Sequence, residues 1–115
     1  MVSRRTIDEI SRKIVERFRP EKIILFGSYA RGEATEDSDV DLLVVSRSPG
    51  PRGKRSAPMI RMLAEEYDLP IDIVVRSPEG LEEWKDVRYS LAHVALTEGI
   101  TLYDKTTHGP GSVVS

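Results

Sequence analysis

The fold is indicated most clearly by residues 22–45, which read KIILFGSYARGEATEDSDVDLLVV. Residues 22–26 and 39–45 are short apolar runs, rich in isoleucine, leucine and valine, which is typical of strands buried in a sheet. Between them lies a segment rich in glycine, serine and acidic residues, which predicts a turn region with one short helix near residues 28–31. We therefore expect two strands of a single sheet joined by this segment.

The residues before this stretch predict a helix. Thr6 and Glu9 have the spacing of a capping box, in which Thr6 is the N-cap and Glu9 bonds back to it. The helix is expected to end at Arg19–Pro20, because the residue before a proline avoids the helical region. The apolar residues that recur at helical spacing between these ends are Ile7, Ile10, Ile14 and Phe18.

The residues after it predict a continued alternation of helices and strands. A helix is expected to open at residues 56–58 and to stop at Leu69–Pro70, followed by a strand at 71–75 and a short helix from Ser77. A last helix is expected at about 88–98, with Gly99 as its C′ residue, and a closing strand at 100–103. The apolar stripes expected on these helices are Ile60, Leu63, Ala64 and Tyr67 on the first and Leu91, Val94 and Ala95 on the last. Alternation of this kind predicts an α/β domain with one sheet.

The composition bounds the class of protein. The 115 residues include 39% hydrophobic and 31% charged residues, an ordinary balance for one globular domain. The chain has no cysteine, which excludes disulfides and thiolate metal sites. No apolar run is long enough to cross a membrane and the first residues lack a signal peptide's apolar stretch, so a cytoplasmic location is expected. The net charge of -2 argues against an extended nucleic-acid surface but permits the binding of one nucleotide.

Three aspartates form the candidate catalytic and metal-binding group. Asp39 and Asp41 are two residues apart on a predicted strand, so their side chains point the same way. Two adjacent carboxylates repel each other and raise at least one pKa, and a divalent cation relieves that repulsion. Asp72 lies within the apolar strand at 71–75 and joins the pair if the two strands are neighbours. Oxygen-only ligands favour Mg²⁺, and such a patch can hold two ions for displacement at phosphorus.

Gly27 and Ser28 are the candidate phosphate-binding residues. They follow a predicted buried strand and open a predicted helix, where free backbone N–H groups attract an anion. Glycine lets the backbone approach closely, and the hydroxyl of Ser28 adds a donor. Arg31 is placed to bind a phosphate oxygen; the alternative for its guanidinium is a salt bridge to Glu33 or Glu36. Phosphates on this turn and metal ions on Asp39, Asp41 and Asp72 would suit nucleotidyl transfer.

These residues resemble a known signature. Gly27–Ser28, ten further residues and then Asp39–Val40–Asp41 match the pattern of the DNA polymerase β-like nucleotidyltransferase superfamily without a gap. The single-domain length resembles its short branch, the minimal nucleotidyltransferases (MntA-like). The resemblance implies an α/β (α+β) fold with a single mixed sheet and helices packed on one face. It implies a nucleotidyltransferase domain at residues 1–105, and residues 106–115 are expected to form a disordered tail.

The resemblance also implies an activity. Members of the superfamily hold two Mg²⁺ ions on the paired aspartates, use ATP as the usual donor, and use the third carboxylate to activate a hydroxyl acceptor. Asp39, Asp41 and Asp72 would be the metal-binding and catalytic residues; Gly27, Ser28 and Arg31 would bind the nucleotide with Asp39 and Asp41. Many minimal members are similar to antitoxins encoded with a HEPN-domain toxin, and some of them adenylylate a tyrosine of that toxin, which implies a hetero-oligomer with this partner.

Other functions stay open at this stage. The chain is alternatively a noncatalytic antitoxin that blocks its partner by occlusion, or it transfers a nucleotide to a small molecule or to an RNA end. Asp72 has the structural alternative of capping a neighbouring helix. Substitution of Asp39 and Asp41 by asparagine would separate catalysis from occlusion.

Several conspicuous residues are expected to have structural roles. Ser38 is expected to stabilise a turn through its own backbone. His93 and His108 have no second histidine at metal-ligand spacing, so neither is a metal-site candidate. Trp84 and Tyr89 are expected in the core or in an interface. The basic segment at residues 47–55 is expected to be a solvated loop, with contact to a nucleic acid or a partner as the alternative.

Overall fold

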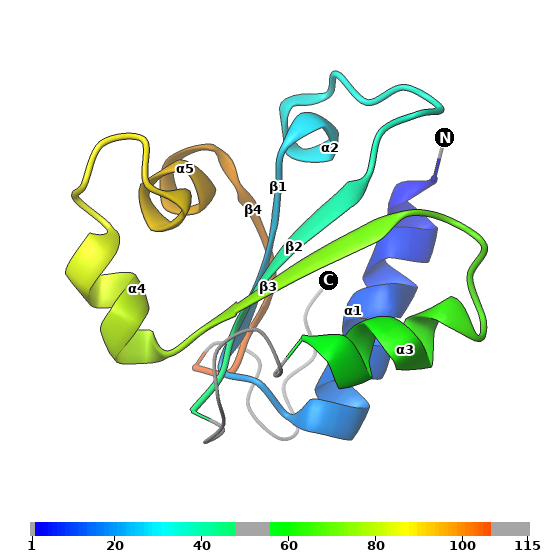
Figure 1. The fold of residues 1–115 in the computed structure, drawn as a ribbon, viewed down its shortest axis with the longest axis horizontal. Coiled ribbons are helices and arrows are strands. Elements are labelled where there is room, and N and C mark those ends of the chain that lie inside the picture. The colour runs from blue at the N-terminus through cyan, green and yellow to red at the C-terminus, as the bar shows by residue number, and fades with distance from the viewer. Residues whose placement is uncertain (1, 48–55, 107–115) are drawn as a thin grey trace.

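A computed structural model of the chain describes residues 2–47 and 56–106, which form one four-stranded sheet (Figure 1). In spatial order the strands are β3 (Ile71–Arg76), β2 (Val40–Val45), β1 (Lys22–Phe26) and β4 (Ile100–Asp104). β1 is antiparallel to both β2 and β4, whereas β2 and β3 are parallel. The expected single mixed sheet is therefore confirmed.

Five helices accompany the strands in the described part of the chain: α1 (Arg4–Phe18), α2 (Ser28–Arg31), α3 (Ala57–Ala64), α4 (Pro78–Trp84) and α5 (Leu91–Glu98). α2 follows β1 directly, as predicted, and α4 begins after Ser77, whose hydroxyl accepts a hydrogen bond from the Gly80 N–H. The predicted end of α1 is also confirmed, because Arg19 adopts a left-handed conformation with φ of 49° and caps the helix.

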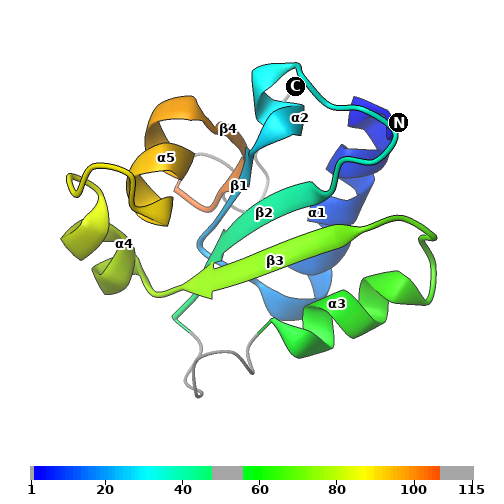
Figure 2. The same ribbon diagram turned by 45° about the horizontal axis from the view of Figure 1, so that its top comes forward.

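The helices cover both faces of the sheet, which differs from the expectation of one face. In Figures 1 and 2, α1 and α3 lie on one side of the sheet and α4 and α5 on the other. The cause is the alternation of apolar residues along the central strands. Leu42 and Val44 of β2 belong to the larger core beneath α1 and α3, whereas Leu43 packs with Ile24 and with Ala95 of α5. Both faces of β2 are apolar, so both require a cover.

The start of α1 corrects the predicted capping box. The N-cap is Ser3, and its hydroxyl accepts a hydrogen bond from the Thr6 N–H. Thr6 is therefore inside the first turn instead of in front of it. Glu9 does not reach back to the helix start; it accepts a hydrogen bond from the hydroxyl of Tyr67, which links α1 to the segment after α3.

The other boundaries differ by a few residues. α3 ends at Ala64, before the predicted stop at Leu69–Pro70, and β2 begins at Val40 instead of residue 39. α5 begins at Leu91 instead of about residue 88, because Tyr89 has a φ of 67° that a helix does not allow. Of the residues predicted to point inward from α5, Ala95 is buried. The other buried residue of this helix is Ala92, which was not predicted.

Gly99 ends α5 for a different reason from the one predicted. Its φ of -79° and ψ of 166° are extended, so it is not a left-handed C′ residue. A Cβ atom at this position would overlap the carbonyl oxygen of Ala95 and would lie 2.9 Å from the carbonyl oxygen of Leu25. Glycine is required here by the close packing of α5 on β1.

Two further predictions fall wholly or mostly on undescribed residues. Residues 48–55, which are most of the basic segment, and residues 107–115, which are most of the expected tail, lie outside the described residues. Within the part that the structure describes, no helix is long and apolar enough to cross a membrane.

Candidate active site

The register of the sheet places Asp41 beside Asp72. The two residues are direct partners in the parallel pairing of β2 with β3, and Phe26 of β1 is the partner of Asp41 on its other side. Paired residues on neighbouring strands share one face of a sheet, and their strands lie about 4.8 Å apart. Asp41 and Asp72 therefore form one carboxylate row, which begins at the end of β1 where Gly27 follows.

Asp39 lies one residue before β2 and two residues before Asp41. The carboxylates of Asp39 and Asp72 are exposed, whereas Asp41 is half-buried between its neighbours. The electrostatics show that the two neighbouring carboxylates act on Asp41. Burial, then the carboxylates of Asp72 and Asp39, raise the pKa of Asp41, and the guanidinium of Arg31 opposes them. The expected repulsion between adjacent carboxylates is thus present in the fold.

These carboxylates do not form a ready-made metal cage. Among residues 2–47 and 56–106, no group of three or more histidine, cysteine, aspartate or glutamate side chains is arranged to hold an ion. Mg²⁺ does not demand such a cage, because it keeps several waters and is bound through one or two carboxylates together with substrate phosphates. The oxygen-only donor set and its mutual repulsion therefore fit that ion, with the remaining ligands to be supplied by a substrate.

Gly27 makes room for Asp41. Its φ of 76° and ψ of -155° lie outside the range that other residues adopt readily. A Cβ atom on residue 27 would overlap Oδ2 of Asp41. The sequence predicted close backbone approach at Gly27, but the group that approaches within the chain is a carboxylate, and no local pattern indicates this contact.

Ser28 is the first residue of α2, a single helical turn. The carbonyl oxygen of Gly27 accepts hydrogen bonds from the N–H groups of Ala30 and Arg31, both at 3.1 Å. Among the described residues the Ser28 hydroxyl has no hydrogen-bond partner, so it is available to a ligand. Tyr29 anchors the turn, because its hydroxyl accepts a hydrogen bond from the Val2 N–H at 3.0 Å. Sequence reasoning did not indicate Tyr29 as a positioning residue.

Arg31 adopts the structural alternative foreseen for it. Its Nε lies 2.8 Å from Glu33, and a guanidinium nitrogen lies 3.9 Å from Glu98 at the end of α5. The hydrogen bond with Glu33 is the main cause that raises the pKa of Arg31. The guanidinium is near enough to Asp41 to affect its pKa, but it is paired with Glu33, which follows α2, and with Glu98 of α5, and it would have to leave them to bind a phosphate.

The structural role expected for Ser38 is confirmed. The Ser38 hydroxyl accepts a hydrogen bond from the Thr35 N–H at 2.9 Å, and the Ser38 N–H donates to the Thr35 carbonyl. This turn directly precedes Asp39 in the chain. His93 lies in α5, where its Nδ1 is 2.9 Å from the Lys85 carbonyl oxygen. Trp84 and Tyr89 are outside the core, with 48% and 84% of their surfaces exposed.

The family follows from comparison with known proteins. Residues 7–95 match the model of the nucleotidyltransferase domain. That range contains β1, β2 and β3 and the three aspartates, and the chain belongs to this family of nucleotide-transferring enzymes.

Similar proteins within this family are named protein adenylyltransferases. A Methanocaldococcus jannaschii protein named as a candidate protein adenylyltransferase is 38% identical over 87 residues, covering 76% of this chain and 82% of that protein. The Thermococcus cleftensis protein adenylyltransferase MntA is 61% identical over 33 residues, which are 29% of this chain and 33% of that protein. A crystal structure of a toxin–antitoxin with AMP-PNP has a TM-score of 0.63 at 23% identity, covering 84% and 73% of the two chains, and so shares the fold.

Proposed function

We propose that this chain is a Mg²⁺-dependent adenylyltransferase, which transfers AMP from ATP to a hydroxyl group of a partner protein. The observation that carries the proposal is the carboxylate row, in which Asp41 is paired with Asp72 and backed by the side-chain-free Gly27. The row belongs to a nucleotidyltransferase domain, and similar proteins are named protein adenylyltransferases.

Asp39, Asp41 and Asp72 would hold the Mg²⁺. The bound ions supply charge neutralisation for the triphosphate and for the pyrophosphate that leaves. On the chain itself, Gly27 lets the backbone approach the phosphates, and the Ser28 hydroxyl donates a hydrogen bond to a phosphate oxygen. Arg31 is the third nucleotide-binding residue, which exchanges its ion pairs with Glu33 and Glu98 for a phosphate oxygen when ATP binds.

Asp72 is the candidate general base. Its carboxylate is exposed at the edge of the row, so an acceptor hydroxyl can reach it from outside the fold. Asp72 accepts the hydroxyl proton, the acceptor oxygen bonds to the α-phosphorus of ATP, and the bond to pyrophosphate breaks in line. Asp41, which is more enclosed, stays beside the phosphates. The division of roles follows from the difference in exposure between two paired carboxylates.

The acceptor is proposed to be a tyrosine of a HEPN-domain toxin, with this chain as its antitoxin in a hetero-oligomer. The toxin–antitoxin crystal structure of the same fold supports a paired arrangement.

The test uses both proteins of the pair. Incubation of the wild-type chain with MgATP and the partner HEPN-domain toxin is expected to add the mass of AMP to a tyrosine of that toxin. Asp41→Asn is expected to bind the toxin and leave its mass unchanged. Absence of any mass gain with the wild-type chain, under conditions where the two proteins are shown to bind, would sink the proposal.

Occlusion without catalysis is the second candidate function. It is favoured by the exposed aromatic side chains after β3, which suit protein binding whether or not a nucleotide is transferred. The double variant Asp39→Asn/Asp41→Asn separates the two: neutralisation of the partner that survives it unaltered would show occlusion, and loss of neutralisation with binding retained would show catalysis.

A further inference from the structure

The sheet face that carries the carboxylate row extends from that row toward α4 and α5. Side chains on a strand change face at every residue, so Asp72, Val74 and Arg76 of β3 lie on one face. Val74 is paired with Leu43 of β2, and both pack in the smaller core with Ala95 of α5. The residues that follow Asp72 on this face therefore lie on the side of the sheet that the second helical layer covers.

A cavity of about 220 Å³ lies at the far end of this face. Arg76 is four residues after Asp72, a separation of about 13 Å along the strand at about 3.3 Å per residue. An extended nucleoside triphosphate whose phosphates lie at the carboxylate row has the length to place its base there. The lining combines Arg76 with residues of α4 and of the start of α5, namely Gly80, Trp84, Ser90, Leu91 and Ala92.

The volume of the cavity suits the base alone. Sites for whole small-molecule ligands usually measure roughly 300–1,000 Å³, so this cavity would not take a complete nucleotide. A flat heteroaromatic ring system is the part of a nucleotide that has the size of one side chain and is stable between apolar walls. The ribose and the phosphates would remain outside the cavity, in the direction of the carboxylate row.

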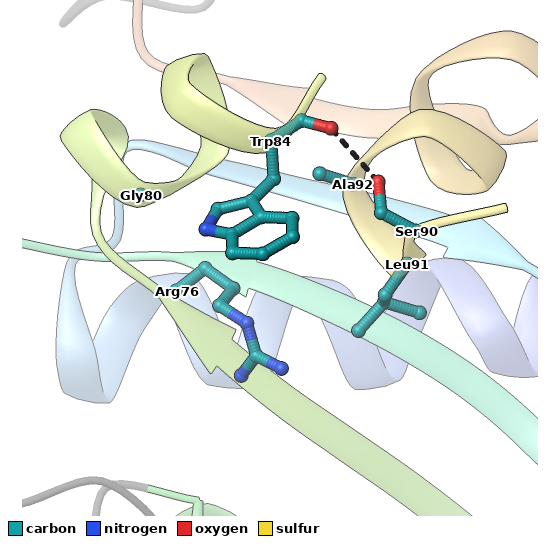
Figure 3. A pocket seen from close by; sticks show the side chains of 6 residues that line it. All are labelled: Arg76, Gly80, Trp84, Ser90, Leu91 and Ala92. Carbon is teal, nitrogen blue, oxygen red and sulfur yellow. Dashed lines mark hydrogen bonds between the residues drawn. The ribbon is translucent and has the colours of Figure 1, made fainter. Parts of the chain in front are cut away.

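Trp84 and Arg76 give the cavity walls that suit a base. Bases stack on aromatic side chains and on guanidinium planes, because every base has a π face. Figure 3 shows the Trp84 indole beside the Arg76 side chain, with Leu91 across the gap. Trp84 is 48% exposed, so packing in the core does not account for the position of its ring. The indole is therefore available to a planar ligand.

The wall formed by Trp84 is fixed before any ligand binds. The Trp84 carbonyl oxygen accepts hydrogen bonds from the Val87 N–H at 3.0 Å and from the Ser90 hydroxyl at 2.8 Å (Figure 3). The Ser90 hydroxyl in turn accepts a hydrogen bond from the His93 N–H at 3.1 Å and so caps α5. A site that is held in this way loses little conformational freedom when it binds a ligand.

The charge of the lining also suits a nucleotide. Arg76 is the one charged side chain among the described residues that line the cavity. Nearby carboxylates of α4 are paired with cations of their own. Glu79 lies 3.7 Å from Arg47. Glu82 lies 2.6 Å from Lys85. The charged group that the cavity presents is thus a cation, which attracts a ligand that carries phosphates and disfavours a basic one.

From these observations we infer that the cavity is the base subsite of the nucleotide-binding site. The base of the ATP stacks on the Trp84 indole, with Leu91 on the opposite side, and the phosphates lie at Asp41 and Gly27. Trp84 is thus a specificity-determining residue that contacts the nucleotide and not the acceptor. The inference rests on the proposed function for the presence of a triphosphate at the carboxylate row, but it requires no transfer to an acceptor.

Trp84 can report on this contact itself, because it is the only tryptophan among the 115 residues. Titration of the wild-type chain with MgATP is expected to quench its fluorescence, since the base stacks on the indole. Inorganic triphosphate with Mg²⁺ is the matched ligand without a base. Calorimetry is expected to show that it binds and competes with MgATP, while the fluorescence of Trp84 stays unchanged.

Variants measured by calorimetry give a second test. Trp84→Ala is expected to raise the dissociation constant of MgATP at least about fivefold and to change that of inorganic triphosphate less than about twofold. Retained binding of inorganic triphosphate shows that this variant is folded. Trp84→Phe keeps a stacking ring and is expected to bind MgATP within about threefold of the wild type. Tyr89→Ala is the control, because Tyr89 is 84% exposed but outside the lining, and it should change the constant less than about twofold.

The outcomes separate the base subsite from the proposed function. MgATP that binds without quenching Trp84, or that binds Trp84→Ala as tightly as the wild type, would overturn the inference and leave the proposed function standing. Equal quenching by inorganic triphosphate would do the same, since the base would not be its cause. A wild-type chain that binds neither MgATP nor inorganic triphosphate would overturn both.

Discussion

The backbone of Gly27 lies so close to the carboxylate of Asp41 that a Cβ atom on residue 27 would overlap Asp41 Oδ2. Gly27 directly follows β1, and Asp41 is the second residue of β2. Phe26, the last residue of β1, pairs with Asp41 across the antiparallel ladder of the two strands. Position 27 therefore requires both a positive φ and the absence of a side chain. The contact joins the turn proposed for phosphates to the carboxylates proposed for metal ions.

Replacement of Gly27 by alanine tests this contact. Gly27→Ala is expected to lower the free energy of unfolding by about 2–4 kcal/mol, because strain at a positive φ and overpacking act together. It is also expected to abolish nucleotide binding, since Asp41 must move. Gly32→Ala is the matched control: Gly32 has a similar φ of 73°, but a Cβ atom there meets nothing within 4 Å. It should lose only about 1 kcal/mol and keep ATP binding. Equal losses in the two variants would contradict the role given to the contact.

The pH dependence of stability should report the pKa of Asp41. Burial, then Asp72 and Asp39, raise that pKa in the folded chain, so the folded state holds the proton more tightly than the unfolded state. Stability contributed by this group is full below the unfolded value of about 3.9 and is lost as pH rises through the raised folded pKa. In chelator, Asp41→Asn should therefore gain stability relative to wild type between pH 3 and neutral pH, by less than about 1 kcal/mol because solvent screens a half-buried group. Urea unfolding at a series of pH values measures the difference, and parallel curves would argue against the coupling.

If the carboxylate row holds Mg²⁺, adding the ion should restore the stability that is lost when Asp41 ionises. A ligand present at 100 times its dissociation constant stabilises the folded state by about 2.7 kcal/mol. The unfolding temperature of the wild type is expected to rise with added Mg²⁺, and more so with ATP, whereas Asp41→Asn should lose most of the increase. Asp37→Asn is a suitable control, because Asp37 is an exposed carboxylate outside the row. A shift that is the same in all three proteins would show that the ion binds elsewhere.

The sequence predicted the strands of the site well because their signals are local. Residues 22–26 and 71–75 are short apolar runs bounded by turn residues, and both became strands with little change in their bounds. The sequence alone does not predict that β2 and β3 are neighbours, because strand pairing joins residues that are far apart in the chain. The register that sets Asp41 against Asp72 comes from the packing of the whole sheet.

What the sequence did not indicate depends on contacts between distant elements. Arg31 pairs with Glu98, which is on α5, and Tyr29 anchors α2 to Val2. An apolar strand predicts burial but not which helix covers each of its faces, so the packing of Leu43 beneath Ala95 of α5 has no local sequence signal. The unusual φ of Tyr89 has no sequence signal, since tyrosine rarely adopts it.

Gly99 offers a test of the second layer. Gly99→Ala is expected to destabilise the fold by about 1–3 kcal/mol, because the added methyl group meets backbone of α5 and β1 that has no room to move. Backbone strain is not the cause, since its φ is -79°. Gly80→Ala is the comparison: Gly80 is within α4, and the new Cβ meets only the Ser77 hydroxyl, at 3.1 Å. The gain of up to about 1 kcal/mol from helix propensity should leave that variant as stable as the wild type or more so. A stable Gly99→Ala protein would mean that α5 packs less closely on β1.

The N-terminus of α1 distinguishes the predicted cap from the observed one. Ser3→Ala removes the hydroxyl that accepts from the Thr6 N–H at 3.2 Å, and it is expected to cost about 1 kcal/mol of unfolding free energy. Thr6→Ala should cost less than about 0.5 kcal/mol, because Thr6 is only partly buried within the first turn and alanine is the better helix former. Urea unfolding of the two variants decides between the caps. If Thr6→Ala were the more damaging change, the capping box at Thr6 and Glu9 would be correct after all, and Glu9 would have to give up its hydrogen bond from Tyr67.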